Sequence, residues 1–166
     1  MRLFIAMNFD KPTKDRLLAI QQKLKACGTG NFTRPENLHL TLVFLGEVQR
    51  YQAVVDSINR HFSEPIPLSF RGTGTFRGDL YWVGITPNPA LNALHQNLCQ
   101  DLRAAGYRIE QRRFSPHITL GREVVVTRQP DLSFEPFSMT ARRISLMKSE
   151  RIQGILTYTE IYGKSV

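Results

Sequence analysis

The feature that most constrains the fold of this chain is an internal repeat, which an offset of 78 positions brings out without a gap. This offset places residues 39–42, with the sequence HLTL, on residues 117–120, with the sequence HITL. It also places the apolar run 4–6 on 82–84 and Gly28 on Gly106. Self-similarity at a fixed offset is the signature of a duplicated structural unit. We therefore expect two copies of one strand–helix–strand unit.

The spacing of apolar residues predicts which segments are helices and which are strands. Helical spacing runs from Lys14 to a stop at Gly28, over 51–62, and from Leu91 to a stop at Gly106. Strand patterns cover 2–9, 38–46, 68–76, 80–86, 117–126, 137–147 and 154–162. No low-complexity linker interrupts the 166 residues. We therefore expect a single domain over 1–166, built from two lobes related by pseudo-symmetry.

The charge of the chain favours a polyanionic partner. Lysine and arginine together number 22 against 14 acidic residues, which gives a net charge of +8. Four arginines gather around the second motif, with only Glu110 among them: Arg108, Arg112, Arg113 and Arg122. We expect this region to attract a phosphate group.

Two further features limit the classes of protein to which this chain can belong. Cys27 and Cys99 are the only cysteines and neither lies in a CxxC pair, so we expect reduced thiols packed as small apolar groups and no metal site. The apolar runs are far shorter than a membrane span, and the first residues lack a signal-peptide cleavage site. The sequence thus predicts a soluble, cytoplasmic protein with no membrane contact.

The motif spacing predicts a chemical site. In a strand, residues two apart share a face, so His39 lies beside Thr41 and His117 beside Thr119, while the intervening apolar residues point to a core. Two imidazoles flanking a phosphate form an acid–base pair, because histidine titrates near neutral pH. The threonine hydroxyls can hold phosphate oxygens, and Arg122 can neutralise charge in the transition state. Such a site requires no metal ion and no cofactor.

Other residues have weaker claims to function. His61 and His95 lack a threonine partner, so we expect surface positions for both. Phe76 and Trp82 are candidates for stacking on a nucleobase, with core packing as the alternative, and for Phe4 we expect core packing. Arg34 and Arg112 either reach a phosphate or remain solvated. The glycines at 72 and 74 do not form a nucleotide phosphate loop, because no Lys-Ser/Thr pair and helix follow them.

These motifs resemble those of the two-histidine (2H) phosphoesterases. The segments that carry the resemblance are RPENLHLTLVFLGEV (34–48), RFSPHITLGR (113–122), the opening RLFIAMNF (2–9) and the closing SERIQGILTYTEIY (149–162). They are most similar to the RNA 2′,3′-cyclic phosphodiesterase branch of bacteria and archaea, also called 2′-5′ RNA ligase. The resemblance covers essentially the whole chain.

The resemblance implies an α+β, bilobal fold, with two antiparallel-rich sheets around a central cleft and helices outside. It implies hydrolysis of a terminal 2′,3′-cyclic phosphate to a 2′-phosphate without a metal or a nucleotide cofactor. His39 would be the proton donor and His117 the proton acceptor, with Thr41, Thr119 and Arg122 holding the phosphate. The sequence itself does not assign these two histidine roles, because the motifs are nearly identical.

Two alternatives stay open beside this hypothesis. The same site can run in reverse, with a 5′-hydroxyl replacing water and forming a 2′-5′ linkage. A non-catalytic module that binds RNA ends is the other alternative, although it would have little need of two titrating groups. The expected partners are RNA ends or nucleotides that carry a 2′,3′-cyclic phosphate, and a monomer is expected because no heptad repeat is present.

Overall fold

A computed structural model describes all 166 residues. It contains three α-helices, one short 3-10 helix and nine strands. In chain order the elements are β1 (Arg2–Asn8), α1 (Lys11–Lys25), β2 (Gly28–Phe32), η1 (Pro35–Asn37), β3 (His39–Glu47), α2 (Gln52–His61), β4 (Ile66–Phe76), β5 (Leu80–Ile85), α3 (Pro89–Ala104), β6 (His117–Val126), β7 (Phe137–Ala141), β8 (Arg143–Ile152) and β9 (Ile155–Ser165).

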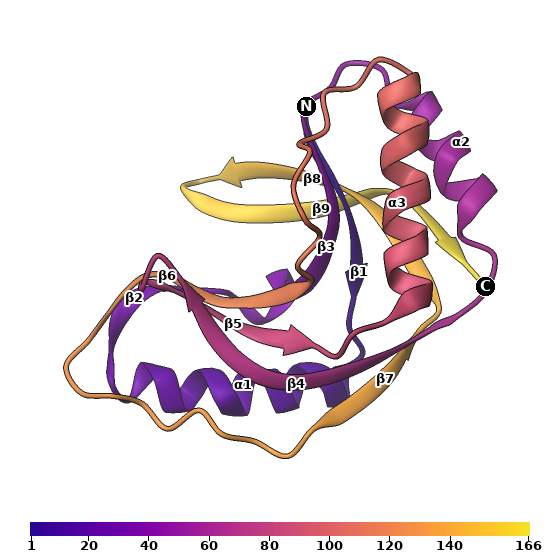
Figure 1. Ribbon diagram of the computed structural model, residues 1–166. Coiled ribbons are helices and arrows are strands. Elements are labelled where there is room, and N and C mark those ends of the chain that lie inside the picture. The colour runs from indigo at the N-terminus through magenta and orange to yellow at the C-terminus, as the bar shows by residue number, and fades with distance from the viewer.

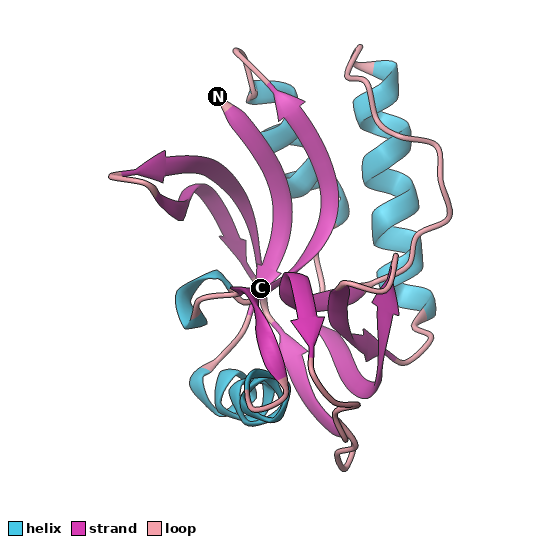
Figure 2. Ribbon diagram, turned by 90° about the vertical axis from the view of Figure 1, so that its left-hand side faces the viewer, coloured by secondary structure: helices cyan, strands magenta, loops and turns pink.

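The strands form two antiparallel sheets. One has four strands in the order β3-β1-β8-β9, and the other has five in the order β2-β6-β5-β4-β7. In Figure 1 the two sheets splay apart, α1 lies along the five-stranded sheet, and α2 and α3 lie together beside the four-stranded sheet. Figure 2 gives the same arrangement from the side, with the helices outside the strands. The predicted α+β class with two antiparallel sheets and outer helices is confirmed.

The repeat is visible at the start of both long helices. Asp10 caps α1 by accepting a hydrogen bond from the Thr13 amide, and Asn88 caps α3 by accepting one from the Leu91 amide. These caps stand 78 positions apart, and a proline occupies the first turn of each helix. Such caps satisfy amide groups that a helix start leaves unpaired. The capping residues therefore extend the sequence repeat beyond the residues that defined it.

Two sequence expectations about element boundaries are wrong. The helix expected to stop at Gly28 ends at Lys25, and Gly28 begins β2, a strand that the sequence pattern did not reveal. A Cβ on Gly28 would lie 2.2 Å from the Val125 carbonyl oxygen, so this glycine permits close strand contact instead of ending a helix. Gly106, by contrast, follows α3 with φ of +95°, as a helix stop should.

The strand expected over 137–147 is two strands. β7 ends at Ala141 and joins the five-stranded sheet, whereas β8 begins at Arg143 and joins the four-stranded sheet. Continuous β-type sequence does not reveal that a chain changes sheets, because both parts have the same local pattern. The bend expected in the 68–76 run is present, since the β4–β5 register shifts between Phe70 and Thr73.

The apolar core joins both sheets. One cluster of 33 buried residues includes Leu3 and Ile5 of the four-stranded sheet and Phe70, Val83 and Ile118 of the five-stranded sheet. The expectation of a single domain over 1–166 stays a prediction, which this shared core supports. Both cysteine side chains are buried and unpaired.

Candidate active site

The two motifs begin two strands that lie in different sheets. His39 is the first residue of β3, and His117 is the first residue of β6. The predicted alternation holds in both: the intervening Leu40 and Ile118 are fully buried, while the histidines and threonines are half-buried. We call the side of each sheet that carries these residues its motif face.

A buried glutamine of α1 anchors the second motif. The Gln21 side-chain amide donates to the backbone carbonyls of Leu120, at 3.0 Å, and of Thr33, at 2.8 Å. The Thr33 hydroxyl in turn donates to the Thr119 carbonyl at 2.8 Å. These bonds fix the backbone of β6 beside the motif side chains.

Each motif histidine is oriented by a carbonyl two residues before it. His39 Nδ1 lies 2.6 Å from the Asn37 carbonyl oxygen, and His117 Nδ1 lies 2.7 Å from that of Ser115. A carbonyl oxygen only accepts hydrogen bonds, so Nδ1 carries the proton in both rings and Nε2 is the nitrogen that exchanges protons. The arrangement repeats at the same offset as the sequence.

The two sites differ at Nε2 and in the support of the carbonyl. His39 Nε2 lies 2.8 Å from the Thr41 hydroxyl, whereas no hydrogen bond within the protein occupies Nε2 of His117. Asn37 is buried, and its side-chain amide donates to the Leu156 carbonyl of β9 at 3.0 Å. Ser115 is exposed. The first histidine is therefore held more tightly than the second.

Burial and positive charge act on both histidines. Burial of the ring lowers the pKa of His39, and the charges of Arg122 and of His117 lower it further, against the opposing effect of the Asn37 carbonyl. Burial likewise lowers the pKa of His117, together with the charges of Arg122 and Arg112. The charge of Arg122 thus lowers the pKa of both motif histidines, although the two motifs lie in different sheets.

Aromatic rings surround each histidine. The Phe4 and Tyr158 ring centroids lie 5.1 Å and 5.2 Å from that of His39. Those of Phe76 and Trp82 lie 5.0 Å and 6.4 Å from that of His117. Phe76 and Trp82, which the sequence offered as stacking candidates, therefore lie beside the second motif.

A glycine explains how the indole fits. Trp82 lies opposite Gly74 in the β4–β5 pair, and a Cβ on Gly74 would lie 2.3 Å from the indole ring. The indole covers the backbone at this position, which accounts for Gly74, whereas Gly72 has a φ of +70°, a conformation that favours glycine. The indole Nε1 is buried and lacks a hydrogen-bond partner.

Phe4 and Phe44 differ from what their sequence positions indicate. Phe4 is buried as expected, but on the motif face, in a small cluster with Ala6 and Met147 that is separate from the main core. Strict alternation along β3 would turn Phe44 toward the core with Leu40. Its side chain is instead 55% exposed, and its ring lies 6.2 Å from that of Phe4.

The other sequence candidates lie apart from the paired histidines. His61 and His95, expected at the surface, are half-buried: His61 Nε2 lies 2.8 Å from Asp101, and the His95 ring stacks on Phe114 at 4.0 Å. Each therefore has a structural partner. Arg34 and Arg112 are exposed and form ion pairs with Glu36 and Glu110. Of these two, only Arg112 acts electrically on a motif histidine.

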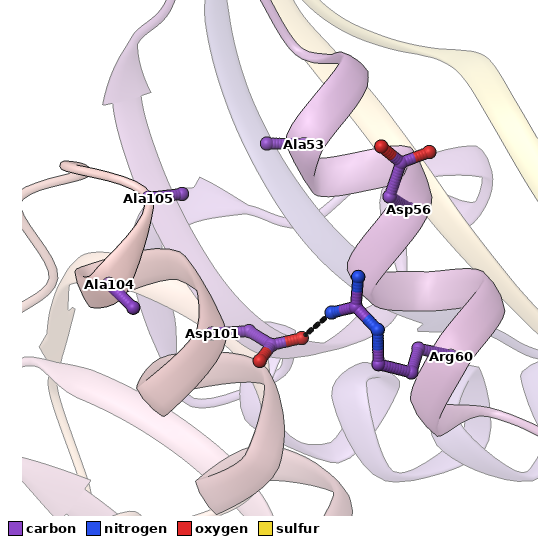
Figure 3. A pocket seen from close by; sticks show the side chains of 6 residues that line it. All are labelled: Ala53, Asp56, Arg60, Asp101, Ala104 and Ala105. Carbon is purple, nitrogen blue, oxygen red and sulfur yellow. Dashed lines mark hydrogen bonds and ion pairs between the residues drawn. The ribbon is translucent and has the colours of Figure 1, made fainter.

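A pocket elsewhere in the molecule has different chemistry. Figure 3 shows it between α2 and α3, lined by Ala53, Asp56, Arg60, Asp101, Ala104 and Ala105. Asp101 accepts hydrogen bonds there from Ser57, Arg60 and His61, which join the two helices. These side chains serve helix packing. The motif histidines are not among the residues that line it.

No group of three or more His, Cys, Asp or Glu side chains is arranged to hold a metal ion. No helix has both the length and the apolar character that a membrane span requires.

Comparison with known proteins identifies the family. The family model described as the 2′-5′ RNA ligase superfamily matches residues 12–153. The RNA 2′,3′-cyclic phosphodiesterase of Methanothermobacter thermautotrophicus is 31% identical, over 97% of this chain and 96% of the relative. The protein of the same name from Thermotoga maritima is 30% identical, over 90% of this chain and 87% of the relative.

Solved structures agree with this result. The crystal structure of E. coli LigT in its apo form covers 99% of this chain, and the match spans 96% of that protein, with a TM-score of 0.83 and 25% identity. LigT complexed with phosphate has a TM-score of 0.81 and 26% identity over the same shares of the two chains. The chain therefore belongs to the 2′-5′ RNA ligase superfamily of two-histidine phosphoesterases, as its paired motifs predict.

Proposed function

We propose that this protein hydrolyses the terminal 2′,3′-cyclic phosphate of RNA to a 2′-phosphomonoester by a two-histidine acid–base mechanism. The observation that carries the proposal is the matched orientation of His39 and His117: a carbonyl holds Nδ1 of each ring, so Nε2 is the nitrogen that can exchange a proton. Relatives that are 30–31% identical over most of this chain are RNA 2′,3′-cyclic phosphodiesterases, which supports the same activity here.

The reaction needs one proton taken up and one released. His117 Nε2 takes a proton from water as the water oxygen attacks phosphorus, and the bond between phosphorus and the 3′-oxygen breaks. Protonated His39 gives its Nε2 proton to that leaving oxygen. The free Nε2 of His117 supports its role as base, because no protein group competes with water there. The product carries a 3′-hydroxyl and a 2′-phosphate.

The remaining residues act on the phosphate and the base. Thr41 and Thr119 donate hydrogen bonds to non-bridging phosphate oxygens, and Arg122 stabilises the charge that develops on them. The action of Arg122 on both histidines supports this assignment, because a phosphate between the rings would meet the same charge. Phe76 and Trp82, beside His117, supply faces for a nucleobase. The mechanism uses no metal ion or cofactor.

The alternatives from the sequence stay open as outcomes of experiment. Ligation by the same site would join a 5′-hydroxyl end through a 2′-5′ linkage, and a non-catalytic module would bind the RNA end unchanged. The monomeric state and the cytoplasmic location expected from the sequence also stay predictions.

The decisive experiment is product analysis with an RNA oligonucleotide ending in a 2′,3′-cyclic phosphate, in the presence of EDTA. We expect the 2′-phosphate product at an undiminished rate. His39→Ala and His117→Ala should each lower kcat/KM by at least about 100-fold, the lower range for a positioned proton transfer. His61→Gln is the matched control, because this histidine lies with Asp101 between α2 and α3, and it should retain activity.

Four outcomes would contradict the proposal. Full activity in either motif variant would exclude the two-histidine mechanism. A 3′-phosphate product would reverse the assigned bond cleavage. Joining to a 5′-hydroxyl acceptor at micromolar concentration faster than hydrolysis would favour the ligase alternative, and tight binding without turnover would favour the binding module.

A further inference from the structure

The exposed position of Phe44 is unusual for a phenylalanine in a strand of this sheet. Leu40 and Val43 of the same strand are buried, yet the Phe44 side chain is 55% exposed. One irregularity in the β1–β3 register, between Ile5 and Ala6, produces this position, since Thr41 lies opposite Ala6, Val43 opposite Ile5, and Phe44 opposite Phe4.

The register places Phe44 on the motif face. Residues directly opposite in an antiparallel pair point to the same side of the sheet, so Phe44 points where Phe4 points. The Phe4 ring lies 6.2 Å from Phe44 on one side and 5.1 Å from His39 on the other. Tyr158 of β9 lies 5.0 Å from Phe4 and 5.2 Å from His39. We call Phe44, Phe4 and Tyr158 the aromatic row. Phe4 and Tyr158 lie next to His39, and the far end of the row is the exposed ring of Phe44.

Positive charge accompanies the aromatic row. The charges of Arg122, Arg2 and Arg151 all act on the Tyr158 hydroxyl, although burial is the larger effect and raises its pKa. None of these three arginines forms an ion pair. The carboxylates next to Arg2 and Arg151 are already paired: Glu47, opposite Arg2, with the amino terminus at 3.3 Å, and Glu150, next to Arg151, with Lys148 at 3.3 Å. The row therefore lies in an excess of positive charge.

An exposed aromatic face combined with unpaired arginines fits a single-stranded nucleic acid, whose bases stack on the ring while its phosphates meet the cations. Phe4 separates Phe44 from His39, so a base on Phe44 does not belong to the nucleotide whose 3′-oxygen His39 protonates. We propose that Phe44 is a subsite for a base upstream of the reacting nucleotide, and that the substrate is therefore an RNA strand extending along the motif face of the four-stranded sheet. This inference rests on the proposed function.

The test compares two substrates on one set of variants. A mononucleotide 2′,3′-cyclic phosphate reaches the histidines but not Phe44, whereas a short oligonucleotide with the same end reaches both. Phe44→Ala should lower kcat/KM for the oligonucleotide by at least about fivefold, as expected for one lost stacking contact. The same variant should leave kcat/KM for the mononucleotide unchanged. Phe44→Trp should keep the wild-type preference. Arg2→Gln should weaken the salt dependence of oligonucleotide turnover by about one unit of slope and leave the mononucleotide unaffected.

The control is Val125→Ala, which removes an apolar side chain that is 67% exposed on the other sheet. This substitution should leave kcat/KM unchanged for both substrates. Equal losses for both substrates in Phe44→Ala, or no loss for either, would overturn the subsite. If the wild-type protein turned over neither substrate, the proposed hydrolysis would fail instead, so the two failures are distinguishable. Unchanged mononucleotide turnover also establishes that Phe44→Ala is folded.

Discussion

At each motif histidine, the two ring nitrogens have separate tasks. Nδ1 of His39 donates to the Asn37 carbonyl and Nδ1 of His117 donates to that of Ser115, so a proton gained or lost during a reaction must pass through Nε2. The carbonyl bonds favour the charged rings, but burial outweighs them and the pKa of each histidine is lowered.

The lowered pKa values predict an acidic optimum. The proposed reaction needs one charged and one neutral imidazole, a form that is most populated between the two pKa values. Since both lie below the ordinary value of about 6.5, kcat/KM of the free enzyme should be greatest below that pH. A profile of kcat/KM against pH tests this. Arg122→Gln should move both limbs to higher pH, because it removes a positive charge that disfavours the charged form of either ring.

The matched control is Arg34→Gln. Arg34 is exposed and paired with Glu36, and its charge is not among those that shift either motif histidine. Its substitution should leave the position of the profile unchanged. An Arg122→Gln enzyme that is slower but has the same profile would contradict the electrostatic effect of Arg122 on the histidines.

At the scale of elements, η1 and β9 cooperate to hold the first motif. Asn37 is the last residue of η1, and its side chain and its backbone carbonyl bind different partners. The side-chain amide donates to the Leu156 carbonyl of β9, and the backbone carbonyl accepts from His39. Tyr158, two residues along β9, packs against the same histidine ring. The position of His39 thus depends on a strand more than 100 residues away in the sequence.

Removing this tether should loosen His39 without unfolding the protein. Asn37→Ala leaves the Leu156 carbonyl without its partner, at a cost of about 1–3 kcal/mol in unfolding free energy. We expect kcat to fall more than KM changes, and the limb of the pH profile that belongs to His39 to shift, since the orienting carbonyl is no longer fixed. Steady-state kinetics across pH and urea unfolding measure both effects.

Asn59→Ala is a suitable control for this variant. Asn59 also joins β9 to a helix, because its side-chain oxygen accepts a hydrogen bond from the Tyr162 hydroxyl, but it lies on α2 away from the histidines. It should affect stability and leave kcat and the pH profile unchanged. Equal kinetic effects in the two variants would mean that Asn37 acts only through general stability.

At the scale of the molecule, the two halves of the sequence are interlocked. The α1 helix follows a strand of the four-stranded sheet but packs on β2 and β6 of the other, while α3 follows a strand of the five-stranded sheet but packs on β3. The last two strands, β8 and β9, complete the four-stranded sheet beside β1. Each sheet therefore depends on both halves of the chain for its packing.

This interlocking predicts one cooperative unfolding transition. Trp82 is the only tryptophan and reports on the five-stranded sheet, whereas far-UV circular dichroism reports on all elements. Their midpoints in urea should coincide, and the calorimetric and van't Hoff enthalpies should agree. Two separated transitions would instead establish lobes that fold independently, contrary to the predicted single domain.

The sequence by itself determined those features of the protein that depend only on residues close together in the chain. Strand periodicity fixes that His39 shares a face with Thr41 and His117 with Thr119, because side chains alternate along a strand whatever surrounds it. The repeat indicated that the two motifs are related, and the helices over 52–61 and 89–104 follow from apolar spacing. The family was also accessible from the motifs alone.

Only the tertiary structure decided what depends on pairing between distant strands. The change of sheet at Arg142 has no local signature, since the same residues suit a strand in either sheet, and β2 begins at a glycine that the sequence pattern assigns to a helix stop. The irregular β1–β3 register turns Phe44 onto the motif face, a position that alternation along β3 assigns to the core. Likewise, Asn37 and Tyr158 meet at His39 only because β9 returns to the first motif. Sequence periodicity describes which side chains share a face, and the register of partner strands decides what that face meets.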